Sequence, residues 1–284
     1  MTKVIFDNLN NGLAQQIIAN VLIFIQALLI CNISLKHKLA NEGTLFSGAL
    51  YVLFVSLFVS NSSLTPALIA NTFLILAISS ILETYKVSDA VSNVFNTGFF
   101  LGSASLIYPP YIISFVFGFI GLAIIYTMRF RESLQYIIGY FIPFALVWVA
   151  SLFFSPLSSS FQVYLKNVFK YTLPQTLTYI DIIGLVIIGI SFLGILLLFN
   201  RLTYKKTIQS QKKIEIIYFL LFTIAVGFGF MATHDFEILV GLALPLSILI
   251  GIYISESKSK ILYELYHLIL VGYIYLSYFN IFNI

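Results

Sequence analysis

The sequence predicts an all-α fold, a polytopic bundle of about ten transmembrane helices joined by short loops. Hydrophobic residues occupy 60% of the 284 positions and aromatic residues 17%, fractions well above those of soluble globular domains. Apolar runs of about 20 residues, the length a helix needs to cross about 30 Å of hydrocarbon, recur from residue 13 to the C-terminus. Because the polar breaks between them are short, we expect residues 1–284 to form one integral membrane domain.

Each expected helix ends where charged residues, Pro, Ser or Asn interrupt the apolar pattern. The first run is expected to persist as a membrane helix rather than be removed as a signal peptide. The tail before it holds one Lys and one Asp instead of a basic segment, and no small-residue cleavage site follows it. The expected helices span residues 13–35, 44–60, 64–82, 90–108, 110–128, 134–154, 179–200, 215–233, 236–254 and 261–280.

The placement of basic residues predicts the orientation of these helices, because Lys and Arg near helix ends concentrate on the cytoplasmic side of a membrane. Of the 15 basic residues, Lys3, Lys166 and Lys170 fall on one side of the expected arrangement and the other 12 on the opposite side. We therefore expect a multi-pass protein of a bacterial inner membrane with both termini extracytoplasmic. The residues expected on the cytoplasmic side are Lys36, Lys38, Lys86, Arg129, Arg131, Arg201, Lys205, Lys206, Lys212, Lys213, Lys258 and Lys260.

A glycine-rich helix followed by two prolines, "FNTGFFLGSASLIYPP" (residues 95–110), is the most patterned part of the chain. Gly98 and Gly102 form a GxxxG pair, and Ser105 continues the same small face. Small residues at this spacing let two helix backbones approach closely in lipid, so we expect this face to pack against another helix. The two prolines predict a tight extracytoplasmic turn.

Residues 155–178 form the only sizeable extracytoplasmic connection and are expected to contain a short interfacial helix. Lys166 and Lys170 are four apart and share one helical face, while most of the apolar side chains lie on other faces. Such a helix would cap the bundle. Alternatively, its two lysines would bind a phosphate of a lipid-linked substrate.

Two titratable clusters are candidates for function, and the first lies on the last expected helix. Glu264 and His267 are three apart there, inside the cytoplasmic boundary. Ionisable residues within a membrane are costly and often functional. This intramembrane polar pair is interpreted either as a structural feature, with Glu264 reaching towards Lys260, or as part of a proton or substrate path.

The second cluster lies in "FMATHDFEILVG" (residues 230–241), between the eighth and ninth expected helices on the extracytoplasmic side. A turn needs polar residues, but other extracytoplasmic turns here use Ser, Asn and Pro without titratable groups. A histidine beside a carboxylate can act as a general base or hold a divalent cation with a partner from another segment. The catalytic candidates are therefore His234, Asp235, Glu237 and Asp7, and the alternative is a solvated turn.

Several protein classes are excluded by what the sequence lacks. It contains no glycine-rich phosphate loop, no H-E-x-x-H and no G-x-S-x-G, and nucleic acid is not an expected partner. With Cys31 as the only cysteine, an internal disulfide and a cysteine-built zinc site are both excluded. No cofactor is indicated.

The segments "ISLKHKLANEGTLFSGALYVLF", "LIANTFLILAISSI", "MRFRESLQYIIGYFIPF" and "HDFEILVGLALPLSILIGIYI" resemble an uncharacterised family of integral inner-membrane proteins of Bacteroidota. This resemblance covers most of residues 33–270 and implies a membrane location without an activity. Residues 83–154 are also similar to the membrane core of the GT-C glycosyltransferases, in which a glycine-rich helix runs outward, turns and returns to a basic cytoplasmic loop. Those enzymes use an acidic residue in their first extracytoplasmic loop, a place comparable to that of Asp7, which here lies in a tail.

Three functions remain open. The first is an envelope-biogenesis enzyme that acts on a polyprenyl- or other lipid-linked substrate at the extracytoplasmic face, with the catalytic candidates and the two interfacial lysines around one cavity. The second is a transporter or flippase, in which Glu264 and His267 would be central. The third is a non-catalytic membrane subunit of an envelope or secretion complex, which would present packing faces to other proteins.

Overall fold

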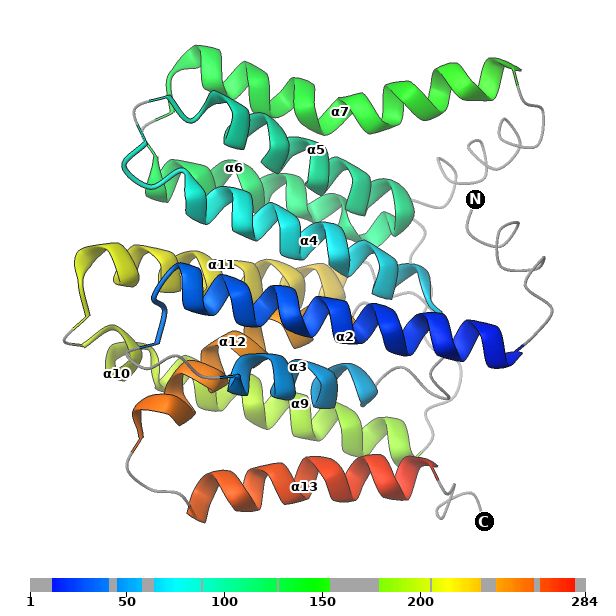
Figure 1. The fold of residues 1–284 in the computed structure, drawn as a ribbon, viewed down its shortest axis with the longest axis vertical. Coiled ribbons are helices and arrows are strands. Elements are labelled where there is room, and N and C mark those ends of the chain that lie inside the picture. Colours follow the sequence, from blue (N-terminus) through cyan, green and yellow to red (C-terminus); the bar gives the residue numbers. More distant parts are fainter. Residues whose placement is uncertain are drawn as a thin grey trace.

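The computed structural model describes residues 12–40, 45–57, 64–87, 89–126, 128–153, 179–204, 206–230, 239–257 and 261–278. Every regular element in these ranges is a helix and none is a strand, which confirms the all-α prediction for them (Figure 1). The elements are α2 (Gly12–Lys36), α3 (Phe46–Ser56), α4 (Pro66–Glu83), α5 (Val91–Ile107), the 3₁₀ helix η2 (Pro109–Ile113), α6 (Ser114–Ile125), α7 (Phe130–Phe153), α9 (Tyr179–Leu197), α10 (Phe199–Thr203), α11 (Ile208–Phe230), α12 (Val240–Glu256) and α13 (Ile261–Tyr278).

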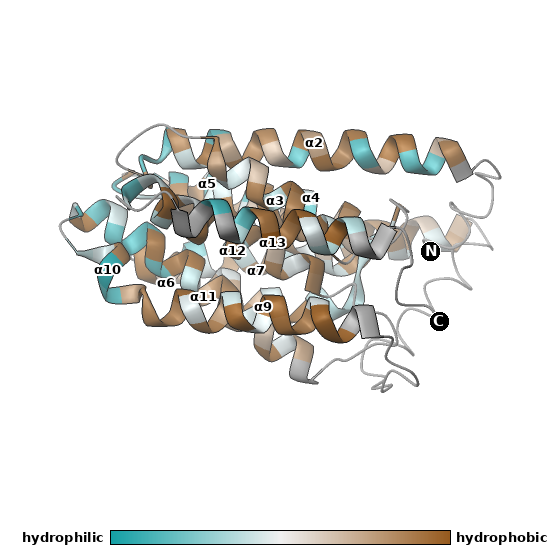
Figure 2. Ribbon diagram, turned by 90° about the horizontal axis from the view of Figure 1, so that it is seen from below, coloured by the Kyte–Doolittle hydropathy of each residue, from teal (hydrophilic) through white to brown (hydrophobic). Residues whose placement is uncertain are grey.

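The long helices lie side by side and alternate in direction, so that α2 begins and α13 ends at the same end of the bundle (Figure 1). The other end carries Lys36, Lys86, Arg129, Lys206 and Lys213, and we call it the basic end. Hydrophilic residues gather at the basic end, while the helices are mainly hydrophobic along the rest of their length (Figure 2). We call the end where α4 and α12 begin the opposite end.

Helix length and composition are compatible with a membrane protein. Shorter apolar helices accompany the long ones, and α12 among them is almost completely buried. The outer surface is apolar as well, since α7 exposes Phe141 and Trp148. Three described helices are long and apolar enough to cross a membrane: Leu13–Lys36, Pro66–Glu83 and Phe130–Phe153.

The helix expected over residues 110–128 is divided in two. Pro109–Ile113 forms η2, and α6 continues the chain. Proline has no N–H to donate and disfavours helix in the residue before it. α5 therefore ends at Ile107, and Tyr108 is extended with φ −127° and ψ 101°. This turn buries the side chain of Tyr111 inside the bundle.

Two helices that begin at the basic end start earlier than the apolar pattern predicts. α7 begins four residues earlier and α11 begins seven residues earlier. Each extension is stabilised by a side chain that accepts a hydrogen bond from a backbone N–H at the start of the helix. At α7, Glu132 Oε2 accepts from the N–H of Arg129 (2.9 Å). At α11, Thr207 Oγ1 accepts from the N–H of Ser210 (3.3 Å). Such caps satisfy N–H groups that have no partner inside the helix, so polar first turns remain helical.

Backbone-to-backbone contact joins α5 to α7. A Cβ added at Gly98 would overlap the carbonyl oxygen of Tyr136, and one added at Gly102 would overlap that of Tyr140. On the same face, Ser105 Oγ accepts a hydrogen bond from the Tyr140 hydroxyl (2.8 Å). The small face of α5 therefore lies directly against α7, at a distance that only glycine permits.

The substitution Gly102→Ala tests this contact. The added methyl group would push the α7 backbone away at Tyr140, and we expect the free energy of unfolding to fall by about 1–3 kcal/mol, as for overpacked core positions. Thermal unfolding in detergent would measure it. Gly194→Ala on α9 is the matched control, because nothing lies within 4 Å of a Cβ there, and it should leave stability unchanged or raise it. Equal effects of the two substitutions would contradict the close contact.

Candidate functional site

Most of the residues predicted to form a site lie outside the described residues. Among the residues that the structure describes, no group of three His, Cys, Asp or Glu side chains is arranged to hold a metal ion. The predicted residues outside the described ranges are the catalytic candidates His234, Asp235, Glu237 and Asp7, and the interfacial lysines Lys166 and Lys170.

The polar pair Glu264 and His267 lies in α13, and both side chains are exposed. Tyr266, between them, points inward instead. Its hydroxyl is 2.7 Å from Ser191 Oγ of α9, and its ring centroid is 6.5 Å from that of Phe54 of α3. Within the stretch from Glu264 to His267, Tyr266 therefore makes the described contacts with the bundle, and the carboxylate and the histidine are exposed.

A buried set of hydrogen-bonded side chains lies towards the opposite end, and we call it the inner network: Gln26, Tyr51, Asn71, Thr72 and Tyr111. Gln26 donates to Thr72 Oγ1 (2.7 Å) and to the Leu68 carbonyl (2.7 Å), and accepts from the Tyr51 hydroxyl (2.6 Å). Asn71 accepts from the Tyr111 hydroxyl (2.8 Å) and lies with its amide nitrogen 3.4 Å from the Tyr51 hydroxyl.

The inner network also reaches the first turn of α12. The Asn71 amide donates to the carbonyl of Val240 (2.9 Å), and Val240 is the first residue of α12. Gln26 and Asn71 are both 0% exposed, so water cannot replace these partners. Polar side chains buried among apolar helices lower the energy only when their hydrogen bonds are satisfied. The network therefore specifies how α2, α3, α4, η2 and α12 fit together.

At the basic end, α2 stops in a defined cap. Lys38 adopts the left-handed conformation with φ 50°, and its N–H donates to the carbonyl of Leu35 (3.1 Å). The N–H of Leu39 reaches back to the carbonyl of Ser34 (3.1 Å). These two bonds form the Schellman arrangement, which turns the chain out of the helix. The turn buries the Leu39 side chain completely.

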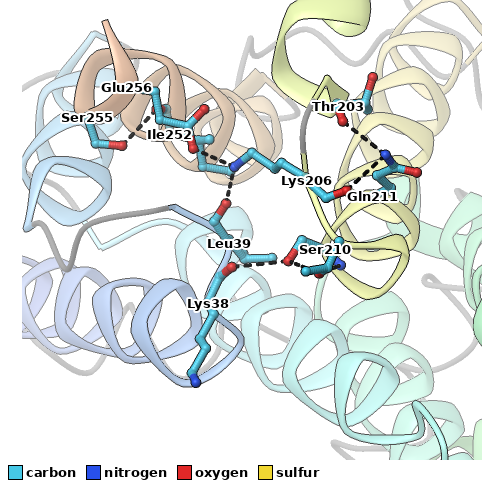
Figure 3. A network of polar contacts seen from close by, with 10 residues as sticks. Lys38, Leu39, Thr203, Lys206, Ser210, Gln211, Ile252, Ser255 and Glu256 are labelled. Atoms are coloured by element: carbon cyan, nitrogen blue, oxygen red, sulfur yellow. Dashed lines mark hydrogen bonds and ion pairs between the residues drawn. The ribbon is translucent and has the colours of Figure 1, made fainter.

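The segment before α11 holds this cap in place (Figure 3). Lys206 Nζ donates to the carbonyl of Leu39 and lies 2.6 Å from Oε1 of Glu256 at the end of α12. Ser210 Oγ donates to the carbonyl of Lys38 (3.3 Å). Because the Lys206 side chain is only 4% exposed, its charge needs these partners. The ends of α2 and α12 and the start of α11 are thus tied together.

Two basic side chains meet next to the α2 cap. Lys213 Nζ of α11 lies 3.0 Å from Nδ1 of His37, and both residues are buried. Burial, followed by the charge of Lys213, lowers the pKa of His37 to about 4, so the imidazole is neutral at pH 7. Burial also lowers the pKa of Lys213. Nearby and more exposed, Lys36 Nζ pairs with Glu83 Oε1 at 2.7 Å.

A family model described as "Family of unknown function (DUF6427)" matches residues 2–284. The chain belongs to this family. No curated protein and no solved structure matches the DUF6427 chain. Because the family itself is described as of unknown function, membership in it does not indicate an activity.

The inner network and the His37–Lys213 contact of this DUF6427 chain are not evident from its sequence. Gln26 and Asn71 stand among apolar residues, and an isolated amide within an expected membrane helix is the one signal that could have pointed to them. His37 lies between Lys36 and Lys38, so the sequence suggests only a basic helix end. Neither the partner of the amides nor that of the histidine is close in sequence.

Replacing Asn71 by Leu tests the inner network. Leucine branches at Cγ as asparagine does but forms no hydrogen bonds, so it leaves the hydroxyls of Tyr51 and Tyr111 and the carbonyl of Val240 without this partner. We expect the free energy of unfolding to fall by about 1–3 kcal/mol, measured by denaturation in detergent. Asn32→Leu, on the exposed face of α2, is the matched control and should stay within about 0.5 kcal/mol of the wild type. If Asn71→Leu is as stable as this control, the network does not organise the bundle.

Proposed function

We propose that this chain is a multi-pass protein of a bacterial inner membrane, with the basic end in the cytoplasm and both termini outside it. The positions of Lys and Arg support this orientation, because positive loops stay on the cytoplasmic side. The three long apolar helices and the mainly hydrophobic length of the bundle support a lipid environment (Figure 2). In this orientation the opposite end is the extracytoplasmic end.

Reporter fusions test the orientation. Green fluorescent protein fused after residues 86, 130, 208 or 258 should fluoresce, because all four positions belong to the expected cytoplasmic side. Alkaline phosphatase at the same positions should be inactive. One active phosphatase fusion among the four would contradict the proposed topology.

We further propose that the protein is an enzyme of envelope biogenesis that acts on a lipid-linked substrate at the extracytoplasmic face. The observation that carries this proposal is the hydrogen bond from Asn71 to Val240. Val240 follows closely after His234, Asp235 and Glu237 in the chain. The inner network therefore anchors the helix that continues from this titratable cluster, and a reactive group needs such rigid support to be held in a productive position.

The residue types fit a transfer reaction on a phosphate-linked lipid, as in the GT-C enzymes that residues 83–154 resemble. His234 would remove a proton from the acceptor hydroxyl, since histidine titrates near neutral pH. Asp235 or Glu237 would orient that imidazole or hold a divalent cation, with Asp7 as a further carboxylate. Lys166 and Lys170 would bind the phosphate of the lipid carrier.

A second candidate function is a non-catalytic membrane subunit, and the exposed face of α7 favours it. This helix packs tightly against α5 on one side only, and its other side presents Phe141, Leu146, Trp148 and Leu152. Large apolar and aromatic side chains in a row are typical of both lipid-facing and partner-facing surfaces. The exposure of Glu264 and His267 does not favour the transporter hypothesis, which needs such groups in the interior.

The triple substitution of His234, Asp235 and Glu237 by Ser distinguishes the two candidates. Serine keeps a polar turn but removes every titratable group, so the enzyme proposal predicts loss of complementation in a deletion strain, although the protein is inserted in normal amounts. Its lipid-linked substrate should accumulate in lipid extracts, with turnover reduced by about 10²-fold or more. Asp89→Ser, an exposed carboxylate at the basic end, is the control and should complement fully.

Full complementation by the triple variant would mean that the cluster is only a solvated turn. The subunit function would then take first place, and co-purification through α7 would be the next measurement.

A further inference from the structure

The His37–Lys213 contact leaves more hydrogen-bond donors than acceptors in a buried place. A lysine ammonium has donors only, so it must donate to Nδ1 of His37 across the 3.0 Å between them. A neutral imidazole carries one proton, which then sits on Nε2. Among the described residues, Nε2 of His37 is buried and has no hydrogen-bond partner. The histidine is 6% exposed and the lysine 2%, so bulk water does not satisfy these donors.

The Tyr85 ring offers its face to two nearby ammonium groups, but it carries no negative charge. Lys213 Nζ lies 5.9 Å from the centroid of the Tyr85 ring, and Lys86 Nζ lies 5.6 Å from the same centroid. Among the described residues, Glu83 is a carboxylate whose negative charge acts on His37. Its Oε1, however, already accepts hydrogen bonds from Lys36 (2.7 Å) and from Ser79 (3.2 Å). This arrangement therefore lacks an anion, a group that carries negative charge and only accepts hydrogen bonds.

We propose that the basic end contains a binding site for a phosphate-type anion, formed by Nε2–H of His37 and the ammonium group of Lys213. Lys36 becomes a third cation of this site when the anion displaces the Glu83 carboxylate from it. The ion pair between Lys36 and Glu83 is the solvent-accessible part of the proposed site, since these side chains are 54% and 33% exposed. The anion therefore enters past Lys36 and Glu83. While no anion is bound, the Glu83 carboxylate pairs with the Lys36 ammonium group.

Two sources can supply this chemistry. One is the phosphate of an anionic lipid head group, which lies at this level if the basic end is cytoplasmic. The other is a free phosphate or soluble phosphoester. The site shares no residue with the proposed catalytic cluster, so its test does not depend on that activity.

The experiment uses the full chain, and thermal unfolding is the readout. In detergent, sodium phosphate is compared with sodium chloride at equal ionic strength. In parallel, phosphatidylcholine nanodiscs are compared with nanodiscs that contain phosphatidylglycerol. At about 100 times Kd the ligand should raise Tm by roughly 5 °C. A rise with phosphate identifies a soluble source, and a rise confined to phosphatidylglycerol identifies a lipid head group.

Variants locate the effect. Lys213→Met and His37→Phe, which remove the ammonium group and the Nε2–H donor, should remove the ligand-dependent rise in Tm. Lys38→Met, which removes one exposed positive charge beside the same cap, should keep it. If neither phosphate nor phosphatidylglycerol stabilises the wild type, the proposal is overturned. It is also overturned if the rise persists undiminished in both Lys213→Met and His37→Phe, because the anion then binds elsewhere.

A measurement on the wild type guards against variants that fail to fold. The chain has three histidines, so uniform ¹⁵N-histidine labelling gives few imidazole signals. The Nε2 signal of His37 should move on addition of whichever anion raises Tm, while that of His267, exposed on α13, should not. An unchanged His37 signal would contradict direct binding.

Discussion

The hydrogen bonds of Asn71 are the interaction on which the arrangement of the helices at the opposite end depends. Apolar helix surfaces attract one another in many registers, because dispersion contacts have little directional preference. A buried amide has far fewer acceptable positions, since each unpaired donor or acceptor costs about 1–3 kcal/mol. Asn71 is satisfied only when η2, α3 and α12 all lie where Tyr111, Tyr51 and Val240 meet it. Gln26 places α2 by the same means.

Packing around this network is uneven. The backbones of α5 and α7 touch at Gly98 and Gly102, where no side chain fits between them. On α9, in contrast, a Cβ at Gly189 or Gly194 would meet nothing within 4 Å, and the same holds for Gly272 on α13. Substitutions on α5 should therefore act through backbone displacement, while small residues on α9 and α13 tolerate larger side chains.

The two ends of the bundle are stabilised by different chemistry. Towards the opposite end, the described inner network uses neutral amides and hydroxyls, which need no counter-ion. The basic end uses charges, and each buried charge requires its own compensation: Lys206 has Glu256 and the Leu39 carbonyl. Lys213 has instead another basic group, His37. That difference between the two lysines is why an external anion is expected at Lys213 and not at Lys206.

The sequence by itself determined the all-α fold, the approximate position of each helix and the concentration of positive charge at alternate helix ends, because hydrophobic length, proline and Lys or Arg act locally. It also indicated that Gly98 and Gly102 form a packing face. Helix ends that depend on a cap, such as the early start of α7, where Glu132 accepts from the N–H of Arg129, were shifted by hydrogen bonds that apolar periodicity does not register. Only the tertiary structure decided what each polar residue touches. Asn71 meets Val240 across 169 positions and His37 meets Lys213 across 176, and no local pattern encodes contacts between residues so far apart in the chain.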